Sequence, residues 1–263
     1  MKINPSIFVK IISFLILLFL CFSCASRKDV VYYQNIENIS EQQKANSFEV
    51  KIQPDDLLMI IVSADDPEVA FPFNLKTFSI SSNNRLDMAR GQETVQLYLV
   101  DQGGNIEFPI VGKLMVGGLT RTEVLKLLQE KISNYIKNPI INLRIMNFKI
   151  SMQGEVNLPG TFPIASERVT LIEALSMAKD LTIYGRRDNI LVIRETNGVK
   201  SYNRIDITKS DFINSPFYYL AQNDVVYVEP NKTRVNSSAV GPNTSVIISA
   251  VSILVSLSVL IFK

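Results

Sequence analysis

Two carboxylate doublets are the first residues in this chain that could carry out chemistry. Asp55 and Asp56 are adjacent, and so are Asp65 and Asp66. Two carboxylates can act as acid and nucleophile on a glycosidic bond. Adjacent residues on a strand point to opposite faces, so neither doublet alone forms such a pair. Because aspartate also stabilises turns through its side chain, we expect a turn and a loop edge here and no catalytic site.

The composition leaves few other groups for catalysis or metal binding. The 263 residues include no histidine, and the two cysteines are Cys21 and Cys24. The chain after Cys24 therefore lacks the commonest metal ligand, the usual near-neutral general base and any thiol. The balance of 27 Lys and Arg against 25 Asp and Glu gives no basic excess for nucleic acid. We expect no enzyme activity, no cofactor, no metal site and no nucleic-acid partner.

Two groups of side chains could recognise a saccharide. The first is aromatic and comprises Tyr202, Phe212, Phe217, Tyr218, Tyr219 and Tyr227. Aromatic rings are usually buried, so positions in a core are the favoured explanation. The second is Arg186–Arg187, which could contact an acidic polysaccharide or a neighbouring subunit. A solvated loop is the default interpretation of such a charge pair.

The N-terminus has the pattern of an export signal. Lys2 and Lys10 precede the apolar stretch Ile11–Phe22, and Ser23 precedes Cys24. The stretch is shorter than the roughly 20 residues that span a bilayer. The pattern resembles a bacterial lipoprotein signal, in which Cys24 becomes the lipid-carrying first residue. An uncleaved membrane anchor is the alternative, and both place the body of the protein outside the cytoplasm.

The C-terminus is a second apolar segment. From Ser245 to Phe262 the chain carries no charge, which predicts a transmembrane helix over residues 244–263. At about 100° per residue, four of its serines fall within a stripe roughly 60° wide. They are Ser245, Ser249, Ser252 and Ser256. This face could line a water-filled pore, or it could let helices pack closely.

Between these segments, the pattern predicts two small units of helices and strands. Each unit has a helix that begins with capping-box spacing, at Thr120 and Glu123 and at Thr170 and Glu173. The stretch "LLMIIV" after Asp56 predicts a buried strand, and residues 64–94 read as an irregular surface excursion. A change of apolar phase near Met146 predicts a β-bulge.

Three stretches resemble the bacterial outer-membrane polysaccharide export proteins (the Wza type). They are "IQPDDLLMIIVSADDPE", "VDQGGNIEFPIVGKLMVGGLTRTEVLKLLQEKISNYIKNPIINLRI" and "MQGEVNLPGTFPI". The first two are similar to the family's export domain, and the third opens a stretch similar to its β-grasp-like SLBB domain. Asp55 stands where the family usually has glycine. "AKDLT" likewise stands where the family tends to have "AGGLT".

The resemblance implies an α+β fold with an export domain, one SLBB domain and a C-terminal transmembrane helix. The expected segments are a signal peptide (1–23), a tether (24–48), the export domain (49–149), the SLBB domain (150–231), a linker (232–243) and the transmembrane helix (244–263).

The function that the resemblance implies is a lipid-anchored subunit of an outer-membrane ring, with most of its chain in the periplasm. The ring passes capsular or extracellular polysaccharide from an inner-membrane co-polymerase and needs no catalytic site. Outer-membrane lipid is the expected anchor for Cys24. There are two alternative functions. One is a periplasmic sugar-binding or scaffold lipoprotein, and the other is a polysaccharide-processing enzyme.

Overall fold

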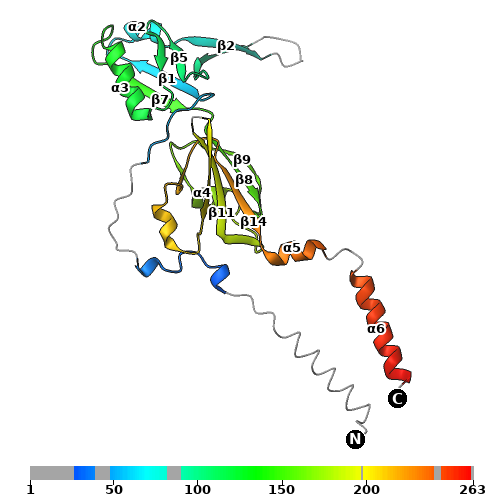
Figure 1. Ribbon diagram of the computed structural model, residues 1–263. Helices are drawn as coiled ribbons and strands as arrows, with labels where there is room; N and C mark the ends of the chain where they lie inside the picture. Colours follow the sequence, from blue (N-terminus) through cyan, green and yellow to red (C-terminus); the bar gives the residue numbers. More distant parts are fainter. Residues whose placement is uncertain (1–26, 39–47, 82–89, 197, 240–243, 262–263) are drawn as a thin grey trace.

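Two hydrophobic cores organise the molecule. The computed structural model describes residues 27–38, 48–81, 90–196, 198–239 and 244–261. Figure 1 shows two bodies stacked end to end, one around β1, β7 and α3 and the other around β8, β11, β14 and α4. We name them the first unit (residues 52–145) and the second unit (residues 147–230). Each has its own cluster of buried side chains, and Ile145 packs against both clusters.

A three-stranded antiparallel sheet forms the centre of the first unit, in the order β4-β1-β7. The strands are β1 (Leu57–Ser63), β4 (Leu97–Leu99) and β7 (Ile140–Ile145). Ile60 pairs with Leu143, and both are fully buried. Every second residue of β1 is buried, so the "LLMIIV" strand buries one face only. A hairpin of β5 (Asn105–Phe108) and β6 (Gly112–Met115) completes the core.

Helix α3 (Arg121–Ile132) covers the sheet of the first unit. Its predicted capping box is confirmed, since the Thr120 side chain accepts from the Glu123 N–H and Glu123 accepts from the Thr120 N–H. Val124, Leu128 and Ile132 are buried, as their spacing on one helical face requires.

The surface excursion between β1 and β4 is more regular than the sequence predicts. It contains α2 (Pro67–Ala70), a 3-10 turn at Phe71–Phe73, and the paired strands β2 (Lys76–Ser81) and β3 (Arg90–Val95). The prediction of irregular structure over residues 64–94 was therefore wrong. Pairing of these two consecutive strands with each other overrode the turn residues that suggested a loop.

A five-stranded mixed sheet forms the second unit, in the order β12-β11-β14-β8-β9. Its strands are β8 (Lys149–Gly154), β9 (Gly160–Pro163), β11 (Gly185–Thr196), β12 (Val199–Ile205) and β14 (Val225–Pro230). β8 and β14 are parallel, and the other pairs are antiparallel. Helix α4 (Leu171–Met177) starts with the second predicted capping box, which is also confirmed.

Short elements complete the second unit. A two-stranded pair, β10 (Val169–Thr170) with β13 (Tyr219–Leu220), and a 3-10 turn at Ser210–Asn214 lie beside α4. After β14 the chain forms α5 (Lys232–Ala239) and α6 (Thr244–Ile261). The predicted bulge near Met146 is wrong, because β7 and β8 belong to different sheets and Met146 lies in the connection between the two units.

The fold-class prediction was wrong in its C-terminal transmembrane helix. Within the residues that the structure describes, no helix has both the length and the apolar character needed to cross a membrane. The 18 residues of α6, five of which are serine, extend for about 27 Å as a helix.

Gly154 is the most constrained glycine of the five-stranded sheet, which leads to a stability prediction. Its φ is +86°, and a Cβ there would overlap the carbonyl oxygen of Val228. We expect Gly154→Ala to lower the free energy of unfolding by at least about 2 kcal/mol. Urea denaturation followed by circular dichroism measures the change. Gly160→Ala is the control, because a Cβ there meets nothing within 4 Å, and equal losses for both variants would contradict the prediction.

Candidate functional site

The residues predicted to carry the membrane functions lie at the two ends of the chain. Cys24 lies outside the described residues, and so does the side chain of Ser245. Ser249, Ser252 and Ser256 are exposed on α6. The hydroxyls of Ser252 and Ser256 donate to the carbonyl oxygens one turn earlier, of Ile248 and Ser252, at 2.8 and 2.9 Å. The serine hydroxyls are thus compatible with an apolar neighbour.

The aspartate doublets serve a turn and a helix cap, as expected. Asp55 has φ +68°, which explains why a glycine is usual at this position in the family that the chain resembles. Asp56 is buried, and its carboxylate accepts a hydrogen bond from the Gln53 N–H at 2.8 Å. Asp66 caps α2 by accepting from the Glu68 N–H at 2.9 Å, and Asp65 is exposed. The structure brings neither doublet together with a second carboxylate across a cleft.

Most of the predicted aromatic group lies in the core of the second unit. Phe212 is buried, and Phe217 and Tyr218 pack against the same cluster. Tyr219 stacks on Phe48 with ring centroids 5.3 Å apart. Tyr202 and Tyr227 are the exceptions, since 64% of the surface of Tyr202 is exposed and Tyr227 is only partly buried outside this cluster. The core prediction therefore fails for Tyr202, because β12 is an edge strand and this residue points away from the core.

Among the described residues, one face of the five-stranded sheet is less buried than the other. Ile190, Val192 and Val226 are buried on the face that α4 covers. The residues that alternate with them along β11, β12 and β14 point to the opposite face and are partly buried or exposed. We name these residues the open face: Leu191, Ile193, Tyr202, Val225 and Tyr227. Their register places them side by side, with Leu191 opposite Tyr227 and Ile193 opposite both Tyr202 and Val225. The open face is thus an apolar strip across three strands.

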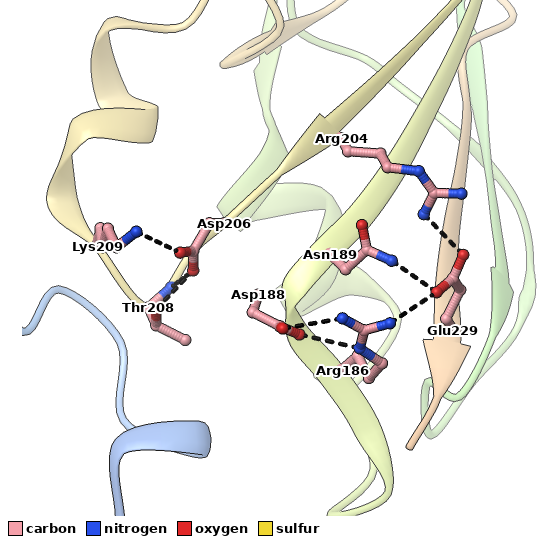
Figure 2. A network of polar contacts seen from close by, with 8 residues as sticks. All are labelled: Arg186, Asp188, Asn189, Arg204, Asp206, Thr208, Lys209 and Glu229. Carbon is pink, nitrogen blue, oxygen red and sulfur yellow. Dashed lines mark hydrogen bonds and ion pairs between the residues drawn. The ribbon is translucent and has the colours of Figure 1, made fainter. Parts of the chain in front are cut away.

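A polar network borders the open face at one end. Glu229, on β14, accepts hydrogen bonds from Arg204 at 2.7 Å, from Asn189 at 2.6 Å and from Arg186 at 3.2 Å. Arg186 also forms a two-point contact with Asp188. Figure 2 shows these five side chains converging from β11, β12 and β14.

The charges of this network are matched within it. Arg204 holds the pKa of the Glu229 carboxyl below its usual range, with further contributions from Asn189 and Arg186. Arg186 likewise lowers the pKa of Asp188. Two cations thus face two carboxylates, and the donors are held in fixed directions. Such a border can form hydrogen bonds to a partner without carrying a net charge.

Arg186 and Arg187 have different environments, and neither lies in a free solvated loop. Arg187 is only 6% exposed, and its guanidinium donates to the carbonyl oxygens of Gly185 and Thr182 at 2.8 and 3.3 Å. It also lies over the ring of Tyr32, 5.7 Å from the ring centroid. The loop interpretation was wrong because β11 begins at Gly185 and includes both arginines.

The segment of residues 27–38, which we name the N-terminal strap, is attached to the second unit. The backbone N–H groups of Tyr33 and Gln34 donate to Ile207 and Thr208. The Tyr32 hydroxyl donates to Asp180 at 2.6 Å. The strap therefore belongs to the second unit in space, although residues 48–146 follow it in the sequence.

The side chain of Asn35 fastens the end of the strap. Its oxygen accepts from the Ser210 N–H and hydroxyl at 2.6 and 2.7 Å, and its amide donates to Asp211 at 3.1 Å. A single amide thus satisfies three groups of the 3-10 turn at Ser210–Asn214.

The arrangement of these residues suits recognition. Hydrogen-bond donors and acceptors border an apolar strip, which is the usual composition of a surface that binds a partner. Across the described parts of the chain, no group of three or more histidine, cysteine, aspartate or glutamate residues could hold a metal ion.

The comparisons with known proteins connect the first unit to polysaccharide export. Residues 44–146 match the family described as polysaccharide biosynthesis/export protein. The chain carries a domain of this polysaccharide export family. We use the name export domain for residues 44–146 from here on. The match includes all of the first unit and ends where the connection to the second unit begins.

Two curated relatives extend the similarity into the second unit. One is the EPS I polysaccharide export outer membrane protein EpsA of Ralstonia solanacearum, 32% identical over 216 residues, which cover 79% of this chain and 56% of the relative. The protein of the same name from Ralstonia nicotianae is 32% identical over 202 residues, covering 74% of this chain and 51% of the relative. The chain thus matches about half the length of each relative.

Sequence reasoning missed the polar network and the attachment of the strap. Arg204, Asn189 and Glu229 come from three strands, and no local spacing indicates that they meet. Asn35 lies in a polar stretch that reads as a tether. Alternation along β11 and β14 could have indicated the open face, because Leu191, Ile193 and Tyr227 occupy alternate strand positions.

The strap contacts lead to a prediction about local opening. We expect Asn35→Ala to lower the exchange protection of the Tyr33 and Gln34 amides by about tenfold or more, because the variant loses three hydrogen bonds of about 1 kcal/mol each. Hydrogen exchange with mass spectrometry measures this protection. The exposed Glu37 provides the control variant, Glu37→Ala. Unchanged protection in Asn35→Ala would show that the strap is held by other contacts.

Proposed function

We propose that this protein is a subunit of an outer-membrane system that exports capsular or extracellular polysaccharide. The observation that carries the proposal is the export domain, together with two relatives named as polysaccharide export outer membrane proteins. In this proposal the protein is a transport component, and its substrate is the polysaccharide chain. An inner-membrane co-polymerase supplies that chain to it.

Lipidation of Cys24 attaches the protein to the outer membrane in this proposal. The support is the small residue before Cys24 and the apolar stretch that precedes it. Two residues separate Cys24 from Arg27, where the strap begins, and a fully extended chain covers about 11 Å over these three steps. Since the strap is attached to the second unit, the lipid anchor holds the second unit near the membrane. The export domain then lies farther from the membrane and faces the periplasm (Figure 1).

Copies of the subunit assemble into a ring in this proposal. The open face supports this, because an apolar strip with Tyr202 exposed is the type of surface that neighbouring subunits cover. We assign the serine face of α6 to packing between helices, because small side chains let two helices approach closely. The second unit, which resembles an SLBB domain, forms the part of the ring next to the membrane.

The exposed ring of Tyr202 also supports a second candidate function. A sugar-binding lipoprotein would use this ring and the fixed donors of Arg204 and Asn189 to hold a saccharide. The two functions differ in assembly state. We expect the full chain, extracted in mild detergent, to have the mass of a multi-subunit ring by light scattering. A monomer that still binds the cell's polysaccharide would favour the second function.

The two cysteines allow a matched test of the lipid anchor. We expect Cys24→Ala to abolish incorporation of radiolabelled palmitate and to move the protein out of the outer-membrane fraction. Surface polysaccharide should fall at least tenfold in the same cells. Cys21→Ala is the control and should keep all three properties, because it removes a thiol three residues away. Labelling that persists in Cys24→Ala would rule out Cys24 as the lipid site.

A further inference from the structure

One side chain, Asn147, connects the two units. It lies in the connection between β7 and β8. Its amide donates to the carbonyl oxygen of Asp55 at 2.8 Å, and its side-chain oxygen accepts from the Leu57 N–H at 2.9 Å. Both partners belong to the turn that enters β1. Asn147 thus holds this turn of the first unit against the start of the second unit.

Gln222 extends the contact on the side of the second unit. Its amide donates to the carbonyl oxygen of Asn147 at 2.9 Å, and its oxygen accepts from the Lys149 N–H at 2.8 Å. Gln222 is only 2% exposed and lies in the turn before β14. We name the set Asp55, Asp56, Leu57, Asn147 and Gln222 the joint. Its hydrogen bonds join the two units, as does the ion pair of Arg121 with Glu167, whose charged atoms are 3.4 Å apart.

The joint contains a buried carboxyl group, and only one of its two oxygens accepts a hydrogen bond within the described residues. Asp56 is fully buried, and its Oδ2 accepts from the Gln53 N–H. Its Oδ1 has no hydrogen-bond partner among the described residues. The side chain of Gln222 faces this carboxyl group from the second unit and lowers its pKa, but the increase caused by burial is larger. An ionised carboxylate here would place an unpaired negative oxygen between the two units, which is costly.

The other charged groups around the joint do not offset that charge. Asp55 is adjacent and repels it. Asp101 follows Val100, whose N–H donates to the Asp56 backbone, and its carboxylate pairs with Lys113 at 3.7 Å. On the second unit, Asp224 is paired with Arg194 at 2.7 Å. The side chain of Lys149 is exposed. No cation in this part of the structure pairs with Asp56.

We propose that the joint is proton-sensitive, such that protonation of Asp56 holds the two units together and its ionisation loosens them. The protonated form removes the buried charge and offers an O–H that can donate toward the Gln222 side chain. The ionised form favours an opening that admits water to Oδ1. Opening would break the contacts of Asn147 and change the angle between the export domain and the second unit.

The direction of the pH dependence follows from the raised pKa of Asp56. Burial raises the pKa of this carboxyl to about 6, from an ordinary value of 3.8. The folded state therefore binds the proton more tightly than the unfolded state does. Stability from this group is complete below about pH 4, and it declines as the pH rises toward 6 and above. The joint is closed in mild acid and loosened at pH 8.

Hydrogen exchange on the full chain in detergent tests the proposal. We expect the protection factors of the Gln53 and Leu57 amides, corrected for intrinsic exchange, to fall by about tenfold between pH 5 and pH 8. The amides of Ile190 and Val192 on β11 should keep their protection, because they lie outside the joint. Equal protection at both pH values, or an equal fall in β11, would overturn the proposal.

Three variants separate the role of the carboxyl group from general stability. Asp56→Asn keeps an oxygen for the Gln53 N–H and cannot ionise, so protection at the joint should become independent of pH. Asp66→Asn is the matched control, because asparagine caps a helix as well as aspartate does, and it should keep the pH dependence. Asn147→Ala should lower protection of Leu57 at both pH values. A pH dependence that persists in Asp56→Asn would assign it to another group.

Discussion

The contact between the Asp55–Leu57 turn and Asn147 is the constraint on which the rest of the structure depends. Each unit has its own apolar core, and burial of apolar surface explains the stability of each core separately. Burial is not directional, so it does not determine the angle between two compact bodies. Directional contacts join the two units: one amide links two backbone groups of one unit to the chain that begins the other, and Arg121 pairs with Glu167.

The second unit combines a closed side with an exposed side. Helix α4 and the strap occupy the closed side and satisfy its polar groups, as the three contacts of Asn35 illustrate. The open face keeps an apolar strip, with the charges of Glu229 and Arg204 matched beside it.

The chemistry of the chain agrees with a role in transport. The carboxylates that suggested catalysis form a turn and a helix cap, and Asp56 is enclosed between the two units, where a polysaccharide cannot reach it. The export domain and the two relatives point in the same direction.

Local features were predictable from the sequence, whereas contacts between distant segments were decided by the tertiary structure. Thr120 with Glu123 and Thr170 with Glu173 each satisfy a helix start within four residues, so spacing alone determined both capping boxes. The Glu229 network, the attachment of Asn35 and the burial of Asp56 each join residues that only folding brings together. The apolar character of residues 244–263 was evident, but it suggested a membrane-spanning helix, and none is found among the residues that the structure describes. The composition of a segment shows how apolar it is. The length of the folded helix and the elements that pack on it determine whether the segment crosses a membrane.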